Sequence, residues 1–392
     1  MHSLNRIYRT IWSEALNAWI AVSELVKSHG KRSGASLLRI LNIAGVNDET
    51  DDLHRHRFKL ALLAASCLLT FQAHANPMGG NVVNGQASFN TSGNTLTVTN
   101  TPGAIIHWQD FSIQANEITR FAQQSASSAV LNRVVGGNTS QILGALQSNG
   151  RVFLVNPNGV VFGAGSTVDV AGLVATSLNL SDADFLAGRH RFSSDPNAQT
   201  VSNAGNLTAQ QGGEIWLIAP DVENTGVITA PNGEILLAAG SSVELVNSLD
   251  PALRVNITAP AGDATNVGQL VAGAGSLGLF GTVVRNSGMV SADSATMQGG
   301  KIVFKASQRT EISGAAIANG MTGGTIHALG NEVGIMDGAT VSANGAQGGG
   351  TILVGGDYQG KNPDVPNAQV TYVAPDASIS ADAGIPSPSG EG

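Results

Sequence analysis

The chain has 392 residues, of which 42% are hydrophobic, 12% are charged and 49 are glycine. This apolar content excludes an intrinsically disordered chain, and many glycines with little charge indicate many short strands and turns. Residues 76–392 carry 11 of the 20 Lys and Arg and 22 of the 28 Asp and Glu. This acidic balance argues against nucleic acid as a partner.

The first 75 residues have the features of a long export leader. The apolar run at residues 60–71 follows basic residues and is too short to cross a bilayer as a helix. Ala73-His74-Ala75 has the small-x-small pattern of a signal-peptidase site, which predicts cleavage after Ala75. Residues 1–27 have the spacing of an amphipathic helix. Because Cys67 is the only cysteine, we expect no disulfide in the mature chain.

After the leader, short alternating runs at residues 76–128 predict strands joined by tight turns. Residues 139–147 predict one short helix that ends at an Asn-Gly pair. A second short helix is predicted after Ser181, because Asp184 completes a capping box and Gly188 supplies a stop.

A strong turn lies between two apolar runs. Residues 151–155 and 160–163 are rich in β-branched and aromatic side chains, which favours strands. Asn-Pro-Asn-Gly at 156–159 separates them. The proline fixes its own φ and favours an extended residue before it, and the following Asn and Gly tolerate a positive φ. The stretch predicts a strand, a fixed turn and a second strand.

An internal repeat begins near residue 200. Asn-Ala-Gly-Asn-Leu-Thr-Ala at 203–209 returns as Asn-Thr-Gly-Val-Ile-Thr-Ala at 224–230, and Gly-Glu-Ile at 213–215 returns at 233–235. Units this short cannot bury an apolar face alone, so they must stack on their neighbours. We predict an all-β fold, a right-handed parallel β-helix of roughly 13–15 coils spaced by ~4.8 Å. A β-sandwich is the alternative, but it leaves the repeat spacing unexplained.

These features divide the chain into four parts. We expect a removed signal peptide at 1–75, a capped β-helical domain at 76–200, further β-helix repeats at 201–380 and a flexible tail at 381–392. An open solenoid end would pair with other chains, so residues 76–110 are expected to cap the first coil.

Metal or cofactor chemistry is not expected. His107, His190 and His327 are isolated in the sequence and lack the spacing of metal ligands. The GxGxxG match at 273–278 is followed by no predicted helix, so we interpret it as a strand corner. No metal ligand and no cofactor is therefore assigned.

Catalysis is not expected either. β-Helical polysaccharide lyases and hydrolases need clustered Asp together with basic residues in one groove. Lys301, Lys305 and Arg309 form the one local basic group after residue 191, and no acidic cluster of ligand spacing lies beside it. We predict a protein that is not an enzyme, with a polysaccharide lyase or hydrolase as the alternative.

Two parts of the chain resemble two-partner secretion exoproteins, the filamentous haemagglutinin-like adhesins of Gram-negative bacteria. Trp12-Ser13 and Ala-Val-Ser-Glu at 21–24 resemble their extended signal peptides. Residues 130–134, 141–144 and 149–163 resemble their secretion domain. Leu131-Asn132-Arg133 stands near the place of the usual Asn-Pro-Asn-Leu motif, as in the subgroup of high-molecular-weight adhesins.

The resemblance implies a secreted adhesin-like exoprotein, exported by Sec through the periplasm and then found outside the cell or on its surface. Its implied partner is a dedicated outer-membrane β-barrel transporter, which the N-terminal domain engages as a secretion signal. Host-cell or bacterial surface receptors or glycans are further candidate partners. The residues implied for the secretion motif and transporter recognition are Asn132, Arg133, Asn156, Pro157, Asn158 and Gly159.

Overall fold

The structure is a computed structural model that describes residues 8–13, 18–23, 76–246, 255–259, 262–295 and 298–384. The chain divides into two units, Met1–Gln72 and Ala73–Gly392, which are taken separately. No helix among the described residues has the length and apolar character that a membrane span requires.

In the first unit, β1 (Tyr8–Ser13) pairs antiparallel with β2 (Ala18–Ser23). The amphipathic helix predicted for residues 1–27 is therefore wrong, since two paired strands occupy this stretch. Both strands are rich in Ile, Trp, Tyr, Thr and Val, which favour strands. Ala73 and Ala75 of the predicted cleavage site lie outside the described residues.

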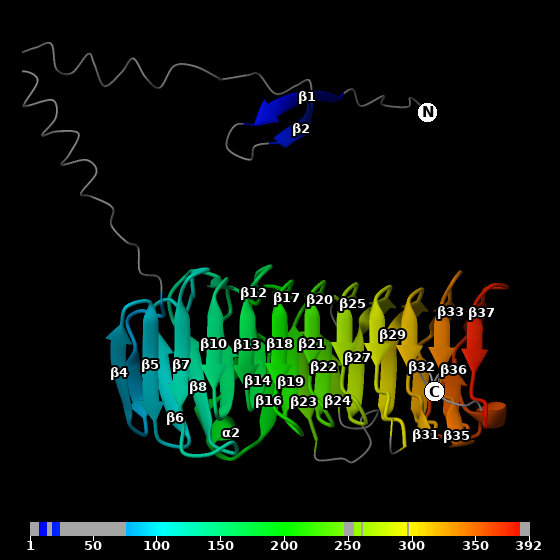
Figure 1. The fold of residues 1–392 in the computed structure, drawn as a ribbon. Coiled ribbons are helices and arrows are strands. Elements are labelled where there is room, and N and C mark those ends of the chain that lie inside the picture. The colour runs from blue at the N-terminus through cyan, green and yellow to red at the C-terminus, as the bar shows by residue number, and fades with distance from the viewer. Residues whose placement is uncertain are drawn as a thin grey trace, which may run out of the picture. The chain divides into compact units, whose positions relative to one another are not determined.

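The second unit is a parallel β-helix, as predicted, and Figure 1 shows its strands stacked side by side along one rod. One side of the rod is a sheet of 12 strands. These are β4 (Ala87–Ser92), β5 (Thr95–Asn100), β7 (Ile118–Ala122), β10 (Ala145–Ser148), β13 (Thr167–Val170), β18 (Asn206–Ala209), β21 (Val227–Thr229), β26 (Gln269–Val271), β28 (Met289–Ser291), β30 (Ala315–Ile317), β34 (Thr340–Ser342) and β38 (Ser378–Ser380).

The other strands of the coils form a second sheet of 18 strands. These are β3 (Asn81–Asn84), β6 (Ala104–Trp108), β8 (Ala129–Val134), β9 (Ser140–Ile142), β11 (Arg151–Val155), β12 (Val160–Phe162), β14 (Gly172–Thr176), β17 (Val201–Asn203), β19 (Glu214–Ala219), β20 (Val222–Asn224), β22 (Glu234–Ala239), β25 (Asp263–Asn266), β27 (Ser276–Asn286), β29 (Lys301–Ile312), β32 (Thr325–Leu329), β33 (Glu332–Ile335), β36 (Thr351–Val354) and β37 (Val370–Val373).

The N-terminal end of the rod is capped by antiparallel strands, as predicted. β4 pairs antiparallel with β5, and β3 pairs antiparallel with β6. Phe89 of the cap meets the ring of Trp108 edge-on at 5.4 Å. The cap covers backbone groups that would otherwise form an open sheet edge.

Because β4 belongs to the cap, 11 parallel strands of the 12-stranded sheet mark the coils within the described residues. The predicted 13–15 coils are too many. Residues 177–200 and 355–369 leave the coils as excursions, so fewer residues than expected build the rod.

The helix predicted at residues 139–147 is wrong. This stretch forms β9 and β10, which pair in parallel with strands of neighbouring coils. Ile142 and Leu146 are fully buried in the interior. Stacking between coils therefore outweighs the local helix preference.

The helix predicted after Ser181 is confirmed as α2 (Asp182–Leu186). The Ser181 side chain accepts a hydrogen bond from the Asp184 amide at 3.1 Å. Gly188 follows the helix with φ +66°, which a glycine adopts without strain. A 3-10 helix, η2 (Tyr358–Gly360), lies in a later loop.

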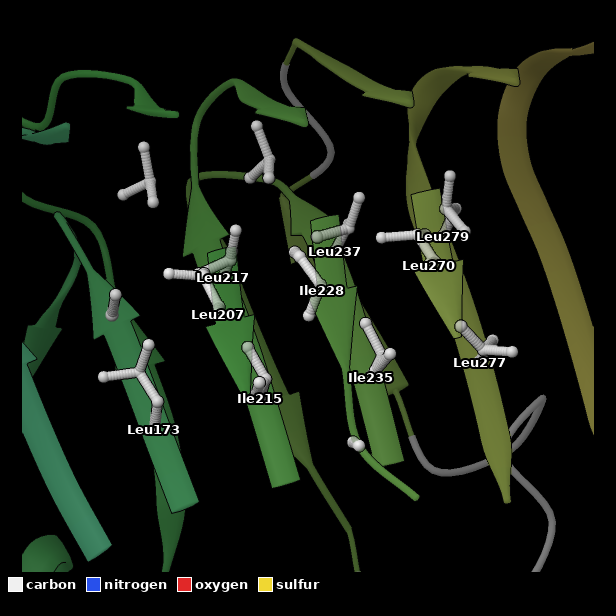
Figure 2. Close-up of a cluster of buried hydrophobic side chains, with 14 of the residues drawn as sticks. Leu173, Leu207, Ile215, Leu217, Ile228, Ile235, Leu237, Leu270, Leu277 and Leu279 are labelled. Carbon is white, nitrogen blue, oxygen red and sulfur yellow. The ribbon is translucent and has the colours of Figure 1, made fainter. Parts of the chain in front are cut away.

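The interior of the rod is filled by ladders of aliphatic side chains. Leu173, Ile215, Ile235 and Leu277 come from successive coils, are fully buried and follow one another along the rod in Figure 2. Burial of this kind contributes roughly 1.5–3 kcal/mol for each large aliphatic side chain. Each coil obtains this energy only from its neighbours, as the repeat implied.

Glycine and asparagine form ladders at the corners. A Cβ atom at Gly226 would lie 2.2 Å from the carbonyl oxygen of Gly205, one coil away. The amide nitrogen of each asparagine donates to the side-chain oxygen of the next at 2.7–2.8 Å. The members of this buried ladder are Asn203, Asn224, Asn266 and Asn286.

A second layer covers part of the outer face of the rod. It consists of α2 and a four-stranded antiparallel sheet. The strands are β15 (Asn179–Leu180), β16 (His190–Ser193), β23 (Ser242–Leu245) and β24 (Val255–Ala259). Phe185 and Phe192 of this layer pack in one apolar cluster with Phe153 and Trp216 of the coils. A small parallel pair, β31 (Gly320–Thr322) and β35 (Gly345–Gly348), lies farther along the chain.

Candidate functional site

The predicted strand, turn and strand at residues 151–163 are confirmed as β11, a turn at 156–159 and β12. β11 lies between β8 and β14. In this register Asn132 pairs with Leu154 and Arg133 pairs with Val155. The structure thus places the two sequence motifs on adjacent coils, with Arg133 beside the last residue before the turn.

Asn156 is fully buried and braces the turn. Its side-chain nitrogen donates to the carbonyl oxygen of Asn138 and to the Ser140 hydroxyl, each at 2.9 Å. Its side-chain oxygen accepts from the backbone amide of Asn158 at 3.0 Å. The Gly159 amide closes the turn by donating to the Asn156 carbonyl at 2.9 Å. Asn156 therefore locks the loop of the preceding coil to the turn.

Pro157 and Asn158 are the half-buried residues of the turn. The Asn158 side chain donates to the Gly136 carbonyl at 3.0 Å. Gly159 has φ +92°, and a Cβ atom there would lie 2.8 Å from the carbonyl oxygen of Thr200. The turn is therefore rigid, and the side chains it offers to solvent are those of Pro157 and Asn158.

Asn132 is fully buried and lies in the interior of the rod. Its side-chain oxygen accepts a hydrogen bond from the Trp108 indole at 2.9 Å. Its side-chain nitrogen donates to the Phe153 carbonyl at 3.3 Å. Asn132 thus links three coils and has no side-chain surface with which to touch a partner of the folded domain.

Arg133 faces outward and ties the second layer to the rod. Its guanidinium donates to the Asn179 side chain at 3.0 Å, the Leu180 carbonyl at 2.6 Å and the Asp182 carboxylate at 2.7 Å. These bonds hold the chain immediately before and at the start of α2. With 16% of its side chain exposed, Arg133 is mainly a tether.

Charge at the other end of α2 is also paired. The hydrogen bond from Arg189, followed by the one with Ser181, lowers the pKa of the Asp184 carboxyl from its ordinary value of 3.8. On β16, the hydrogen bond with Glu244 raises the pKa of the Arg191 guanidinium. These ion pairs are solvent-exposed, so each adds little to stability.

The turn offers no reactive groups. Its side chains are amides and a proline, held by hydrogen bonds, and none of them is a nucleophile with an adjacent base. Across the described ranges, no three His, Cys, Asp or Glu side chains gather as metal ligands. The bracing residues Asn138 and Ser140 were missed in the sequence because they lie on another coil, 18 and 16 residues from Asn156.

The capped rod with a braced outer corner defines a class of protein, the parallel β-helix. Comparison with known families identifies the particular one. The TPS secretion domain matches residues 73–328, and the extended signal peptide of the type V secretion system matches residues 5–46. The chain belongs to the TPS secretion domain family.

Individual relatives agree with this assignment. The crystal structure of the HMW1 secretion domain from Haemophilus influenzae matches with a TM-score of 0.74 and 31% identity, over 79% of this chain and 84% of that chain. A heme/hemopexin-binding protein of Haemophilus influenzae is 42% identical over 130 residues, 31% of this chain and 14% of the relative. The autotransporter adhesin NhhA of Neisseria meningitidis is 38% identical over 73 residues, 19% of this chain and 9% of the relative.

The resemblance drawn from residues 130–163 is therefore confirmed, including the similarity to a high-molecular-weight adhesin. The extended signal peptide and the TPS domain together indicate Sec export followed by secretion across the outer membrane. A TPS domain implies an outer-membrane transporter as its partner. Exoproteins with this domain are typically non-enzymatic. The matched segments span 14% or less of the length of the curated relatives.

Proposed function

We propose that the surface around the turn at residues 156–159 engages the outer-membrane transporter, and that the exported rod acts outside the cell as an adhesin. The observation that carries the first part is the bracing of the turn. Asn156 is buried with four hydrogen-bonding contacts, whereas Pro157 and Asn158 keep accessible surface. A rigid corner loses little conformational entropy on docking.

The six motif residues divide into three roles under this proposal. Asn132, Asn156 and Gly159 shape the coil and the turn from inside. Arg133 positions residues 179–182 on the outer face. Pro157 and Asn158 are left as the side chains that touch the transporter.

The test is a secretion assay in cells that express the chain with its transporter. We expect Asn156→Ala and Asn158→Ala to lower the released fraction while Sec processing continues, and Asn116→Ala, an exposed asparagine remote in sequence, to leave it unchanged. Normal release of both turn variants would refute the proposal.

Thermal unfolding of the released protein distinguishes residues that contact the transporter from residues that brace the turn. Asn156→Ala removes buried hydrogen bonds and should lower Tm together with secretion. Pro157→Ala removes no hydrogen bond, so it should lower secretion with Tm nearly unchanged. If Pro157→Ala is secreted as well as the wild type, Pro157 is not a transporter contact.

The adhesin part of the proposal is supported by the relatives, since NhhA is named an adhesin. Its test is adherence of expressing cells to host-cell monolayers, compared with cells that lack the gene. The polysaccharide lyase or hydrolase is the alternative, and the typically non-enzymatic character of the family disfavours it. Turnover of uronate polymers by the purified chain, with or without calcium, would revive it.

A further inference from the structure

A shallow groove lies at the opposite end of β11 from the turn. It forms where the first residues of β11, β19 and β22 meet β16 of the outer layer, and it encloses about 620 Å³. None of the six residues of the secretion motif lines it. The side chains that matter for its chemistry are Arg151, His190, Gln210, Gln211, Glu214 and Glu234.

The absence of a side chain at Gly172 makes room for two charged residues of the groove. Gly172 pairs with Arg151 of the coil before it. A Cβ atom at Gly172 would lie 2.7 Å from the Glu214 carboxylate and 3.3 Å from the Arg151 side chain. The glycine therefore leaves room for the ion pair between Arg151 and Glu214, whose side chains are 27% and 17% exposed. The pair is largely desolvated and fixed in place.

One wall of the groove is aromatic and rigid. The His190 ring stacks on Phe153 with centroids 5.9 Å apart, and it meets Trp216 edge-on at 5.0 Å. The Trp216 indole donates to the Glu234 carboxylate at 3.1 Å. These contacts lock the rotamers of the wall, so the polar groups above it are held before any ligand arrives.

The rim supplies planar polar groups, some that donate hydrogen bonds and some that accept them. Glu214 and Glu234 are paired in register on adjacent strands, and Gln210 and Gln211 are exposed beside them. The two carboxylates face one guanidinium, so polyanions are repelled. An apolar ligand would cover these polar groups and offer them no hydrogen bonds in place of those to water. A neutral ligand rich in hydroxyl groups satisfies amide donors, amide acceptors and carboxylate acceptors together.

We infer that this groove binds a neutral oligosaccharide. Its hydroxyl groups donate to Glu214 and Glu234 and exchange hydrogen bonds with Gln210 and Gln211, and its ring lies along the wall that carries His190. The inference rests on the adhesin part of the proposed function and names the chemistry of its receptor. It does not depend on how the turn at residues 156–159 engages the transporter.

The test is titration of the secreted, purified chain with neutral oligomers of glucose, galactose, mannose and N-acetylglucosamine, followed by calorimetry. A heparin oligosaccharide and haem serve as ligands of other chemistry. The groove variant is Gln210→Ala/Gln211→Ala, which changes only exposed side chains. The matched control is Gln114→Ala, an exposed amide on another loop.

We expect saturable binding of at least one neutral oligomer, a loss of at least tenfold in the groove variant and no change in the control. The inference is overturned if no neutral oligomer binds, if the groove variant binds as tightly as the wild type, or if only heparin or haem binds. Measuring the secretion and cell adherence of the same variants distinguishes a failure of this inference from a failure of the proposed function. Normal secretion with retained adherence in the groove variant would reject this groove and leave the proposed function standing.

Discussion

Replacing Asn224 by alanine interrupts the buried asparagine ladder at its middle. The change removes the hydrogen bond that Asn224 accepts from Asn203 and the one that it donates to Asn266, both 2.8 Å long. It also removes a weaker bond to the Gly226 carbonyl at 3.2 Å. The side-chain oxygen of Asn266 then loses its ladder donor in a site with no exposed surface.

The expected cost follows from these losses. Each intramolecular hydrogen bond contributes about 0.5–1.5 kcal/mol, and an orphaned buried polar group costs about 1–3 kcal/mol. Two ladder bonds and one orphaned acceptor together predict a loss of about 2–6 kcal/mol in the free energy of unfolding. Exposed Asn206 lies in the same repeat, and Asn206→Ala should change stability by less than ~0.5 kcal/mol.

Urea unfolding of the secreted chain, followed by tryptophan fluorescence, measures this cost. Trp108 and Trp216 are both buried and lie on different coils, so they report on separate parts of the rod. Midpoints are compared at equal m values, because repeat arrays depart from two-state behaviour.

A double variant sharpens the test. Replacing Asn266 together with Asn224 removes the acceptor that the single change orphans. The loss in the double variant should therefore be smaller than the sum of the two single losses, by about 1–3 kcal/mol. A loss under ~1 kcal/mol for Asn224→Ala, or full additivity in the double variant, would refute the reasoning.

Three further changes probe other contacts. Gly226→Ala puts a methyl group 2.2 Å from a carbonyl oxygen and should lower the free energy of urea unfolding by at least ~2 kcal/mol. The control Gly137→Ala meets no atom within 4 Å and should be nearly neutral. Equal effects of the two changes would contradict this reasoning. Arg189 lowers the pKa of the Asp184 carboxyl from 3.8. The stabilisation of the fold by this ion pair is therefore present above pH 3.8 and is lost as the pH falls through the pKa of Asp184 in the folded protein. Because this pair is solvent-exposed, Asp184→Asn should flatten the acid-unfolding curve only slightly, as measured by circular dichroism, and a steeper curve would contradict the pairing. Arg133→Ala removes three hydrogen bonds to residues 179–182 and should speed proteolysis near α2, mapped by mass spectrometry; wild-type cleavage rates would count against a tether.

The repeat was readable from the sequence because the fold requires small and amide side chains at fixed corners. Gly213 and Gly233 recur since a Cβ at Gly233 would lie 2.0 Å from the Gly213 carbonyl. Asn203 and Asn224 recur because they bond to each other. The capping box at Ser181 was equally visible because all of its partners lie within one turn.

The wrong and missing predictions have a common cause, because contacts between residues far apart in the sequence decide the local structure there. Residues 139–147 carry a helix pattern, yet pairing with coils on both sides makes them strands. The outer sheet was not predicted, because β16 pairs with β23 across 53 residues, as Arg191 with Glu244. The turn at 156–159 was predicted in shape, but its bracing by Asn138 was not. The groove was invisible because its residues come from separate coils.

The pairing distances also set an order for folding after export. Lys301 pairs with Thr325 and Thr325 pairs with Thr351, so each of these coils needs only the one beside it. Closing such short loops costs less entropy than closing the outer sheet. The outer sheet in turn packs on the outward-facing side chains of Phe153 and Trp216, which are aligned only after the coils have stacked. The rod should therefore form first and α2 with the outer sheet last, so the groove beside β16 is completed only in the fully folded protein.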